Sequence, residues 1–267
     1  MKLSLSTALS SLRPTLRYLF ILMIAQHVAA DDDDDSTKIT ANFTEPATGI
    51  LMQRFFGAKS GFGFAIAVPD TPSTANATSF IGHMTFPLAN GAGWGGWSLT
   101  GDMEGPLLMA AWLGPDGGSV VSSFRQADNE DDNPPEVTGA FTVLPIAEAT
   151  SANSSFLTYT FLCEGCLAST FGLGPDQTAA TVEMGWALGS KAVGNPESSA
   201  AVLNFHNVGF GGFQAQLGLA RLPQADFDRV AALAGPPAQP AAGAVQFAGD
   251  NGGEGDDSDD SEDEDDD

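Results

Sequence analysis

The stretch GFGFAIAVP at residues 61–69 alternates glycine or alanine with larger apolar residues. A period of two is typical of a β-strand, in which neighbouring side chains point to opposite faces of a sheet. Further apolar runs of strand length recur on the C-terminal side, separated by clusters of Pro, Gly, Asn or Asp. They are SFIGHMTFPL (79–88), LLMAAWLG (107–114), SVVSSFR (119–125), AFTVLPI (140–146), FLTYTFLC (156–163), TVEMGWALG (181–189) and AAVLNFH (200–206). This pattern predicts an antiparallel sandwich or barrel.

The predicted β domain covers residues 38–225, which is a usual length for a single domain of this class. Residues 226–267 are expected to form a short helix, a linker and an acidic tail. The helix is read from PQADFDRVAALAG at 223–235, and the linker from the Pro/Ala-rich stretch PPAQPAAGA at 236–244. We find no internal repeat.

The N-terminal segment 1–30 has the features of a secretory signal peptide. Arg13 and Arg17 precede the short apolar run YLFILMIA, and Val28 and Ala30 stand at the −3 and −1 positions of a cleavage site. The run is too short to span a bilayer, so no membrane span is expected, and an acidic C-terminus gives no sign of a lipid anchor. We therefore expect a secreted, extracellular protein. Three sequons mark expected glycosylation sites, at Asn42, Asn76 and Asn153.

The charge of the chain is strongly negative and unevenly distributed. The formal net charge is −24, and acids concentrate in DDDDD at 31–35 and in residues 250–267. Such runs repel themselves and bury no apolar surface, so we expect residues 31–37 and the C-terminal tail to be disordered. A surface of this charge does not favour nucleic acid as a partner.

The sequence gives little support for the catalytic sites of the common hydrolases. His83 and His206 are the two histidines outside the signal segment, and neither lies in a nucleophile motif. Two carboxylates suffice for a glycosidase, so that class stays open, although many acids lie in loop-like segments such as DNEDDNPPE at 128–136. Two cysteines and two histidines make a structural zinc site improbable.

Cys163 and Cys166 in LCEGCL have the spacing of a redox dithiol. A thioredoxin-type pair precedes a helix in a βαβ unit, whereas this pair follows the strand-like FLTYTFL. In a secreted chain without other thiols, a structural disulfide that closes a tight turn is favoured. Its short loop predicts little entropic stabilisation.

Two residues have the chemistry of haem ligands. His206 lies in the apolar, glycine-rich stretch NFHNVGFGGF at 204–213, and Met103 lies in a turn between Gly101 and Gly105. An apolar thioether in a polar turn needs an explanation, and Met/His is a ligand pair of electron-transfer cytochromes. The chain has no CxxCH for covalent attachment. A packed core histidine is the alternative for His206, and His83 in IGHMTF is a competing ligand that we interpret as a surface or core residue.

A series of motifs resembles a known family. The motifs are FTEPATGI (43–50), FIGHMTFPLANG (80–91), WGGWSLTGDMEGPLLMAAW (94–112), GGSVVSSFR (117–125), FLCEGC (161–166), MGWALG (184–189) and FHNVGFGGF (205–213). In this order they resemble the cytochrome domain of fungal cellobiose dehydrogenases, a member of the DOMON-like group. The resemblance covers about residues 41–220.

This resemblance implies an all-β, immunoglobulin-like antiparallel β-sandwich that binds haem b. It implies that Met103 and His206 are the axial ligands of the haem iron and that Cys163 and Cys166 form a disulfide. It also implies that Arg125 lies near the haem edge, where we expect a propionate contact. The family often has aromatic residues shortly after this arginine, whereas QADNEDDNPP follows it here.

The function expected from these residues is a relay of single electrons by a secreted haem b cytochrome domain. The expected donor is a flavin dehydrogenase or a small reductant, and the expected acceptor is a copper polysaccharide monooxygenase, ferric iron or a quinone. No glycine-rich loop of the phosphate-cradling kind opens a helix in the sequence, so we expect no flavin dehydrogenase domain in it. The main alternative is a haem-free β-sandwich that binds carbohydrate or another cell-wall ligand on Trp94, Trp97 and Trp112. An inert acidic protein is the third possibility.

Overall fold

The structure is a computed structural model that describes residues 38–70, 78–129 and 132–249. Several features that the sequence singles out lie outside these residues. They are the signal segment 1–30, the acidic run 31–37, the sequon at Asn76 and the acidic tail 250–267.

The larger of the two main sheets has eight strands. Its path runs through β1 (Ala41–Thr44), β2 (Leu51–Phe56), β3 (Gly63–Pro69), β4 (Phe80–Pro87), β11 (Phe156–Glu164) and β10 (Ser151–Ala152). Two further strands join from the side, because β9 (Thr142–Pro145) pairs with β11 and β14 (Arg221–Leu222) pairs with β3. All pairs are antiparallel except the parallel pair of β14 and β3.

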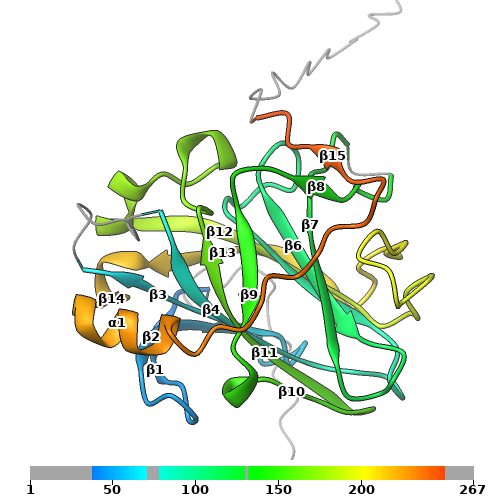
Figure 1. Cartoon of the computed structure of the whole chain (residues 1–267), viewed down its shortest axis with the longest axis horizontal. Coiled ribbons are helices and arrows are strands. Elements are labelled where there is room, and N and C mark those ends of the chain that lie inside the picture. Colours follow the sequence, from blue (N-terminus) through cyan, green and yellow to red (C-terminus); the bar gives the residue numbers. More distant parts are fainter. Residues whose placement is uncertain (1–37, 71–77, 130–131, 250–267) are drawn as a thin grey trace, which may run out of the picture. The chain divides into compact units, whose positions relative to one another are not determined.

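The second main sheet has five antiparallel strands (Figure 1). Its order is β13 (Gly209–Gln216), β12 (Thr181–Gly189), β5 (Trp94–Ser98), β6 (Leu108–Leu113) and β7 (Val120–Arg125). A small parallel pair joins β8 (Val137–Thr138) to β15 (Val245–Gln246). The helical segments are short: η2 (Ala147–Ala149), η3 (Ser169–Phe171), η4 (Pro175–Ala179), η5 (Leu217–Leu219) and α1 (Gln224–Ala231).

The main core lies between the two large sheets. Alternation along β4 directs Phe80, Met84 and Phe86 into this core. The five-stranded sheet contributes residues such as Trp97 and Phe213, and the rings of Phe80 and Trp97 meet with centroids 5.5 Å apart. Two antiparallel sheets packed over a shared apolar core are a β-sandwich. The predicted all-β sandwich is therefore confirmed.

His83 lies on β4 but faces the other way, into a second core between the eight-stranded sheet and helix α1. It is 4% exposed, and its Nδ1 lies 2.8 Å from the hydroxyl of Thr160. The ring of Phe43 lies 5.3 Å away. Burial lowers the pKa of His83 to about 4, with a smaller opposing effect from Glu45 and a further lowering by Arg54. The interpretation of His83 as a core histidine agrees with this position.

The strand predicted for AAVLNFH is wrong. Residues 200–206 form a loop that contains an isolated β-bridge partner, Val202, which pairs with Gly194. Its apolar residues are buried because Ala201 and Leu203 pack on Trp94 and Trp112, on the outer face of the five-stranded sheet. The loop thus covers a third, small hydrophobic core.

The C-terminal strap, which we define as residues 236–249, lies along the sandwich after α1 (Figure 1). The sequence suggests a linker here, but the structure holds the stretch with backbone hydrogen bonds. Ala238 N donates to Val143 O on β9, and β15 pairs with β8. Near its end, the ring of Phe247 packs edge-on against Phe141 and Phe171, with centroids 6.1 and 5.0 Å apart.

The predicted disulfide is present. Cys163 at the end of β11 is bonded to Cys166, and both residues are fully buried in the main core. Gly165 between them has a φ of +69°, a conformation that favours glycine in the tight turn.

Candidate haem site

Two cavities lie against the outer face of the five-stranded sheet, away from the main core. The first has a volume of about 140 Å³ and the second of about 380 Å³. The second falls in the range of ligand pockets, roughly 300 to 1,000 Å³, and the first is smaller. Met103, Phe205 and His206 line both cavities, so the two spaces meet at these side chains.

The floor of this site is a row of small residues in register across the sheet. Ala187 on β12 pairs with Gly96 on β5, Gly96 pairs with Ala110 on β6, and Ala110 pairs with Ser123 on β7. Their sheet neighbours Trp97 and Met109 belong to the main core, so the small residues face outward. The row therefore leaves a low platform, which suits a flat ligand.

Met103 lies in the turn between β5 and β6, half buried among polar residues. Two side chains build this turn: Asp102 N donates to the Thr100 hydroxyl (3.3 Å), and Glu104 N donates to the Asp102 carboxylate (3.1 Å). Gly105 N then donates to Ala127 O (3.1 Å). These bonds hold the turn while the thioether itself lines both cavities.

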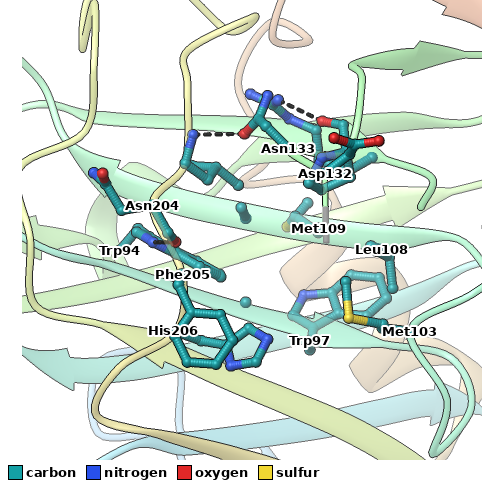
Figure 2. Close-up of a pocket in the computed structure, with 15 residues that line it drawn as sticks. Trp94, Trp97, Met103, Leu108, Met109, Asp132, Asn133, Asn204, Phe205 and His206 are labelled. Atoms are coloured by element: carbon teal, nitrogen blue, oxygen red, sulfur yellow. Dashed lines mark hydrogen bonds between the residues drawn. The ribbon is translucent and has the colours of Figure 1, made fainter. Parts of the chain in front are cut away.

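His206 lies in the loop just before β13 and is half buried. The rings of Phe205 and Phe210 flank it, each with its centroid 4.3 Å from the imidazole, and Trp94 lies 6.5 Å away. Trp94 also fixes the loop, because its indole Nε1 donates to Asn204 O (2.9 Å). Figure 2 shows His206 and Met103 at one end of the first cavity, opposite Asp132 and Asn133.

Arg125 at the end of β7 lines the first cavity and is 1% exposed. Its Nε donates to the Ser123 hydroxyl (2.6 Å), and its Nη1 donates to Pro134 O (2.9 Å). Its Nη2 donates to Ser199 O (2.6 Å) and Ala201 O (2.9 Å). A guanidinium has five N–H donors, so one remains for a further partner. Burial lowers the pKa of Arg125 to about 10 and Glu136 partly opposes this effect, so the side chain is charged at neutral pH.

The residues present fit a haem. One thioether and one imidazole line the same two cavities, and this pair is a known axial set for haem iron. The walls are largely apolar, with Trp94, Trp97 and Leu108 among them. The Trp97 indole Nε1 is buried without a hydrogen-bond acceptor among the described residues, and its ring packs in the main core on the other face of the sheet.

The other residues singled out by the sequence lie elsewhere or do not serve a surface site. His83 faces away from the cavities on the other sheet, and the disulfide is on β11. Trp94, Trp97 and Trp112 are 7%, 2% and 1% exposed, so none of them is an open platform for a sugar ring. Within the described ranges, no three His, Cys, Asp or Glu side chains are grouped to hold a metal ion.

Sequence reasoning missed several residues that shape the site. Asn133 and Leu203 both line the first cavity. Their two loops are joined by a hydrogen bond that Leu203 N donates to Asn133 Oδ1 (2.7 Å). Gln126 donates from Nε2 to Gly105 O (2.9 Å), close to Met103. Nothing in the sequence marks these contacts, because each joins a side chain to a distant backbone group.

Comparisons with known proteins identify the family of this chain. A family model described as the cytochrome domain of cellobiose dehydrogenase matches residues 43–228. The structure is similar to the cytochrome domain of Myriococcum thermophilum cellobiose dehydrogenase, with 27% sequence identity, a TM-score of 0.63, and coverage of 76% of this chain and 99% of that chain. It is also similar to the cytochrome b domain of pyranose dehydrogenase from Coprinopsis cinerea, with 25% identity, a TM-score of 0.61, and coverage of 76% and 100%. The range matched by the family model includes Met103, Arg125 and His206.

Proposed function

This chain belongs to the family of cytochrome domains of cellobiose dehydrogenase, and from that premise we propose that it is a haem b protein that relays single electrons. The observation that carries the proposal is the placement of Met103 and His206. They come from two loops more than a hundred residues apart, yet both line the same two cavities. No acid, base or nucleophile is required for electron relay, which agrees with the lack of hydrolytic motifs.

Met103 and His206 would hold the iron of a bound haem, which would supply a one-electron couple. The chain's own residues have simpler tasks. Phe205 and Phe210 flank the imidazole of His206 and limit its orientation. The small-residue platform of the sheet would exclude water from one side of the ligand. Arg125 supplies positive charge at the other end of the first cavity, where a carboxylate of the ligand would be favoured.

The proposed donors are a flavin dehydrogenase or a small reductant, and the proposed acceptors are a copper polysaccharide monooxygenase, ferric iron or a quinone. The rim of the site supports this proposal, because it offers an exposed point of contact for such partners. Phe205 and Phe210 are 63% and 62% exposed, so the site reaches the protein surface. Electron transfer requires only such a close approach and not a closed substrate pocket.

We also propose that the protein is extracellular and glycosylated. The disulfide between Cys163 and Cys166 suits an oxidising compartment. Of the expected glycosylation sites, Asn42 and Asn153 are exposed in the structure. No helix among the described residues is long and apolar enough to cross a membrane.

One absorbance experiment tests the haem assignment. The purified protein, supplemented with haem, is expected to show a Soret band that shifts on reduction with dithionite. His206→Ala is expected to lose this spectrum, whereas the control His83→Gln keeps it because His83 faces the second core. A parent protein without a Soret band, or an unchanged spectrum in His206→Ala, would contradict the proposal.

A further inference from the structure

Strand β7 ends at the polar residue Arg125, and the polar residue Gln126 follows it directly. Both are buried, with 1% and 5% of their surfaces exposed. Among the residues that the structure describes, neither has a carboxylate as its hydrogen-bond partner. Their partners are mostly backbone groups of other loops, and these loops lead to the two proposed haem ligands.

Arg125 holds the loop that carries His206. Its Nη2 donates to the carbonyls of Ser199 and Ala201, which lie 74 and 76 residues further along the chain. The loop then continues to His206 without a regular element. A buried cation is costly unless it is fully hydrogen-bonded, so these bonds fix both the guanidinium and the loop.

A second route from Arg125 reaches the same loop (Figure 2). Its Nη1 donates to Pro134 O (2.9 Å), and the neighbouring Asn133 accepts a hydrogen bond from Leu203 N (2.7 Å). Leu203 is three residues from His206. The His206 loop is thus held at three points that depend on Arg125 directly or through residues 133–134.

Gln126 holds the turn that carries Met103. Its Nε2 donates to Gly105 O (2.9 Å), two residues after Met103, and to Gly249 O (3.2 Å) at the end of the C-terminal strap. Its Oε1 accepts a hydrogen bond from Ala248 N (3.0 Å). One carboxamide therefore ties the Met103 turn to the strap.

We propose that Arg125 and Gln126 are paired positioning residues, with Arg125 setting the loop of His206 and Gln126 setting the turn of Met103. This inference rests on the proposed function, because it treats both residues as haem ligands. Two consecutive residues at the end of β7 then fix the separation of two ligands whose loops lie more than a hundred residues apart in the sequence. A purely structural role would stabilise the fold without affecting ligation.

The Gln126 half of the proposal is tested by carbon monoxide binding to the ferrous protein. Gln126→Ala frees the Met103 turn, so carbon monoxide is expected to displace the thioether about 10-fold faster, the lower end of the effect of removing a ligand's outer hydrogen bonds. Gln126→Glu keeps the acceptor for Ala248 N but loses the donor to Gly105 O. It is expected to bind carbon monoxide as fast as Gln126→Ala.

Phe247→Ala is the matched control for this half. It loosens the strap, because Phe247 packs on Phe141 and Phe171, but it leaves the bond from Gln126 to Gly105 intact. Carbon monoxide is expected to bind this variant at the parent's rate. Equal acceleration in Phe247→Ala and Gln126→Ala would show that strap stability alone matters, and would overturn this half.

The Arg125 half is tested by the rate of haem loss to an excess of a haem-binding acceptor protein. Arg125→Lys keeps the charge but cannot reach all four acceptors with one ammonium group. We expect haem loss about 10-fold faster than in the parent. Asn133→Ala, at an exposed position, removes the bond to Leu203 N and is expected to change the rate in the same direction without endangering folding.

Arg229→Lys is the control for the Arg125 half, because Arg229 is exposed on α1 and donates to Thr48 O away from the site. Haem loss from Arg125→Lys and Asn133→Ala at the rate of Arg229→Lys would overturn the proposal. Failure of the proposed function is visible separately, since the parent would then show no haem absorbance at all. Unfolding of the haem-free variants, followed by circular dichroism, separates loss of ligand positioning from loss of stability.

Discussion

At the residue scale, Met103 is the side chain whose surroundings differ most from its chemistry. It is a thioether in a turn built by Thr100 and Asp102, while most other methionines of the sandwich are fully buried. The sequence alone points to Met103 through its polar neighbours, and the structure adds that it shares two cavities with His206. Position and chemistry together favour a ligand over a packing residue.

Replacing Met103 is expected to lower the midpoint potential of the bound haem. A thioether opposite histidine favours the ferrous state, so Met103→His lowers the potential on the order of 0.1 V, within the roughly 0.8 V range set by axial ligands. Spectroelectrochemical titration measures the change. Met52→Leu, a buried methionine of the second core, is the control and keeps the parent's potential. A potential that does not move in Met103→His would exclude this residue as a ligand.

Because His83 is buried, we expect the folded protein to lose stability in mild acid. Burial lowers its pKa in the folded protein to about 4, below the ordinary value near 6.5. The unfolded chain therefore binds a proton more readily, and the stability that is full above pH 6.5 is lost as the pH falls toward 4. The loss is on the order of 3 kcal/mol. The environment includes Glu45, which opposes the shift, and Arg54, which adds to it.

Urea unfolding at pH 7, 5.5 and 4.5 measures this effect in the haem-free protein. In His83→Gln, the free energy of unfolding is expected to change less over this range than in the parent, because His206 and the acids are common to both proteins. Identical pH dependence in the two proteins would show that His83 does not carry the effect.

At the scale of elements, whether a strand can be predicted from an apolar run depends on where in the fold that run is buried. Runs such as FLTYTFLC became strands because they bury one face in the main core. AAVLNFH has the same apolar content but covers the outer face of a sheet as a loop, and composition does not distinguish the two cases. Strand β5 (WGGWS) was missed because glycines give no β signal, although their small size forms the platform of the site.

The hydrogen-bond partners of Arg125 are a part of the site that could not be predicted from the sequence. The resemblance placed it at the haem edge, and it does line the first cavity. Its acceptors, however, are carbonyls of Pro134, Ser199 and Ala201, and backbone carbonyls have no residue-type signature. Only the folded chain shows that one side chain joins these loops.

The C-terminal strap is expected to contribute to stability as part of the sandwich. Phe247→Ala removes a half-buried ring from Phe141 and Phe171, so the free energy of unfolding falls by about 1–2 kcal/mol, below the 3–5 kcal/mol of a fully buried phenylalanine. Urea unfolding measures it. Val245→Ala, at a position 48% exposed on the same strap, should stay within about 0.5 kcal/mol of the parent. Equal effects of the two substitutions would contradict the packing role.

The disulfide is expected to stabilise the protein modestly. Its cysteines are separated by only 3 positions, and the closure of so short a loop contributes about 2 kcal/mol. Replacing both cysteines with alanine should lower the free energy of unfolding by about this amount. The haem spectrum should not change, because the pair lies on β11 in the other sheet. An altered spectrum would show that the turn reaches the site.

At the scale of the whole molecule, negative charge dominates. The formal net charge is −24, and Asp102 and Asp132 line the two cavities, where Arg125 is the basic side chain. Long-range attraction or repulsion changes the rate of encounter more than the strength of a contact. The charge of an electron acceptor should therefore decide how quickly it reaches the site.

Small acceptors of opposite charge provide the test. Oxidation of the reduced protein by a cationic metal hexaammine complex is expected to slow as salt is added, because salt screens the attraction. Oxidation by anionic ferricyanide should accelerate, because salt screens the repulsion. A neutral quinone is the control and should show little salt dependence. Stopped-flow absorbance at several ionic strengths measures all three rates. The same salt trend for both ions would exclude electrostatic control.

The anchoring of Gly249 has a consequence for any protein joined to this one. Gln126 donates to both Gly249 O and Gly105 O, so Gly249 is tied to the turn that carries Met103. A partner fused after residue 249 by a short flexible linker would start beside the site, at an effective concentration in the millimolar range. Covalent attachment at this end would thus turn a slow bimolecular encounter into an intramolecular one. The strap therefore provides a point of attachment beside the site as well as a part of the fold.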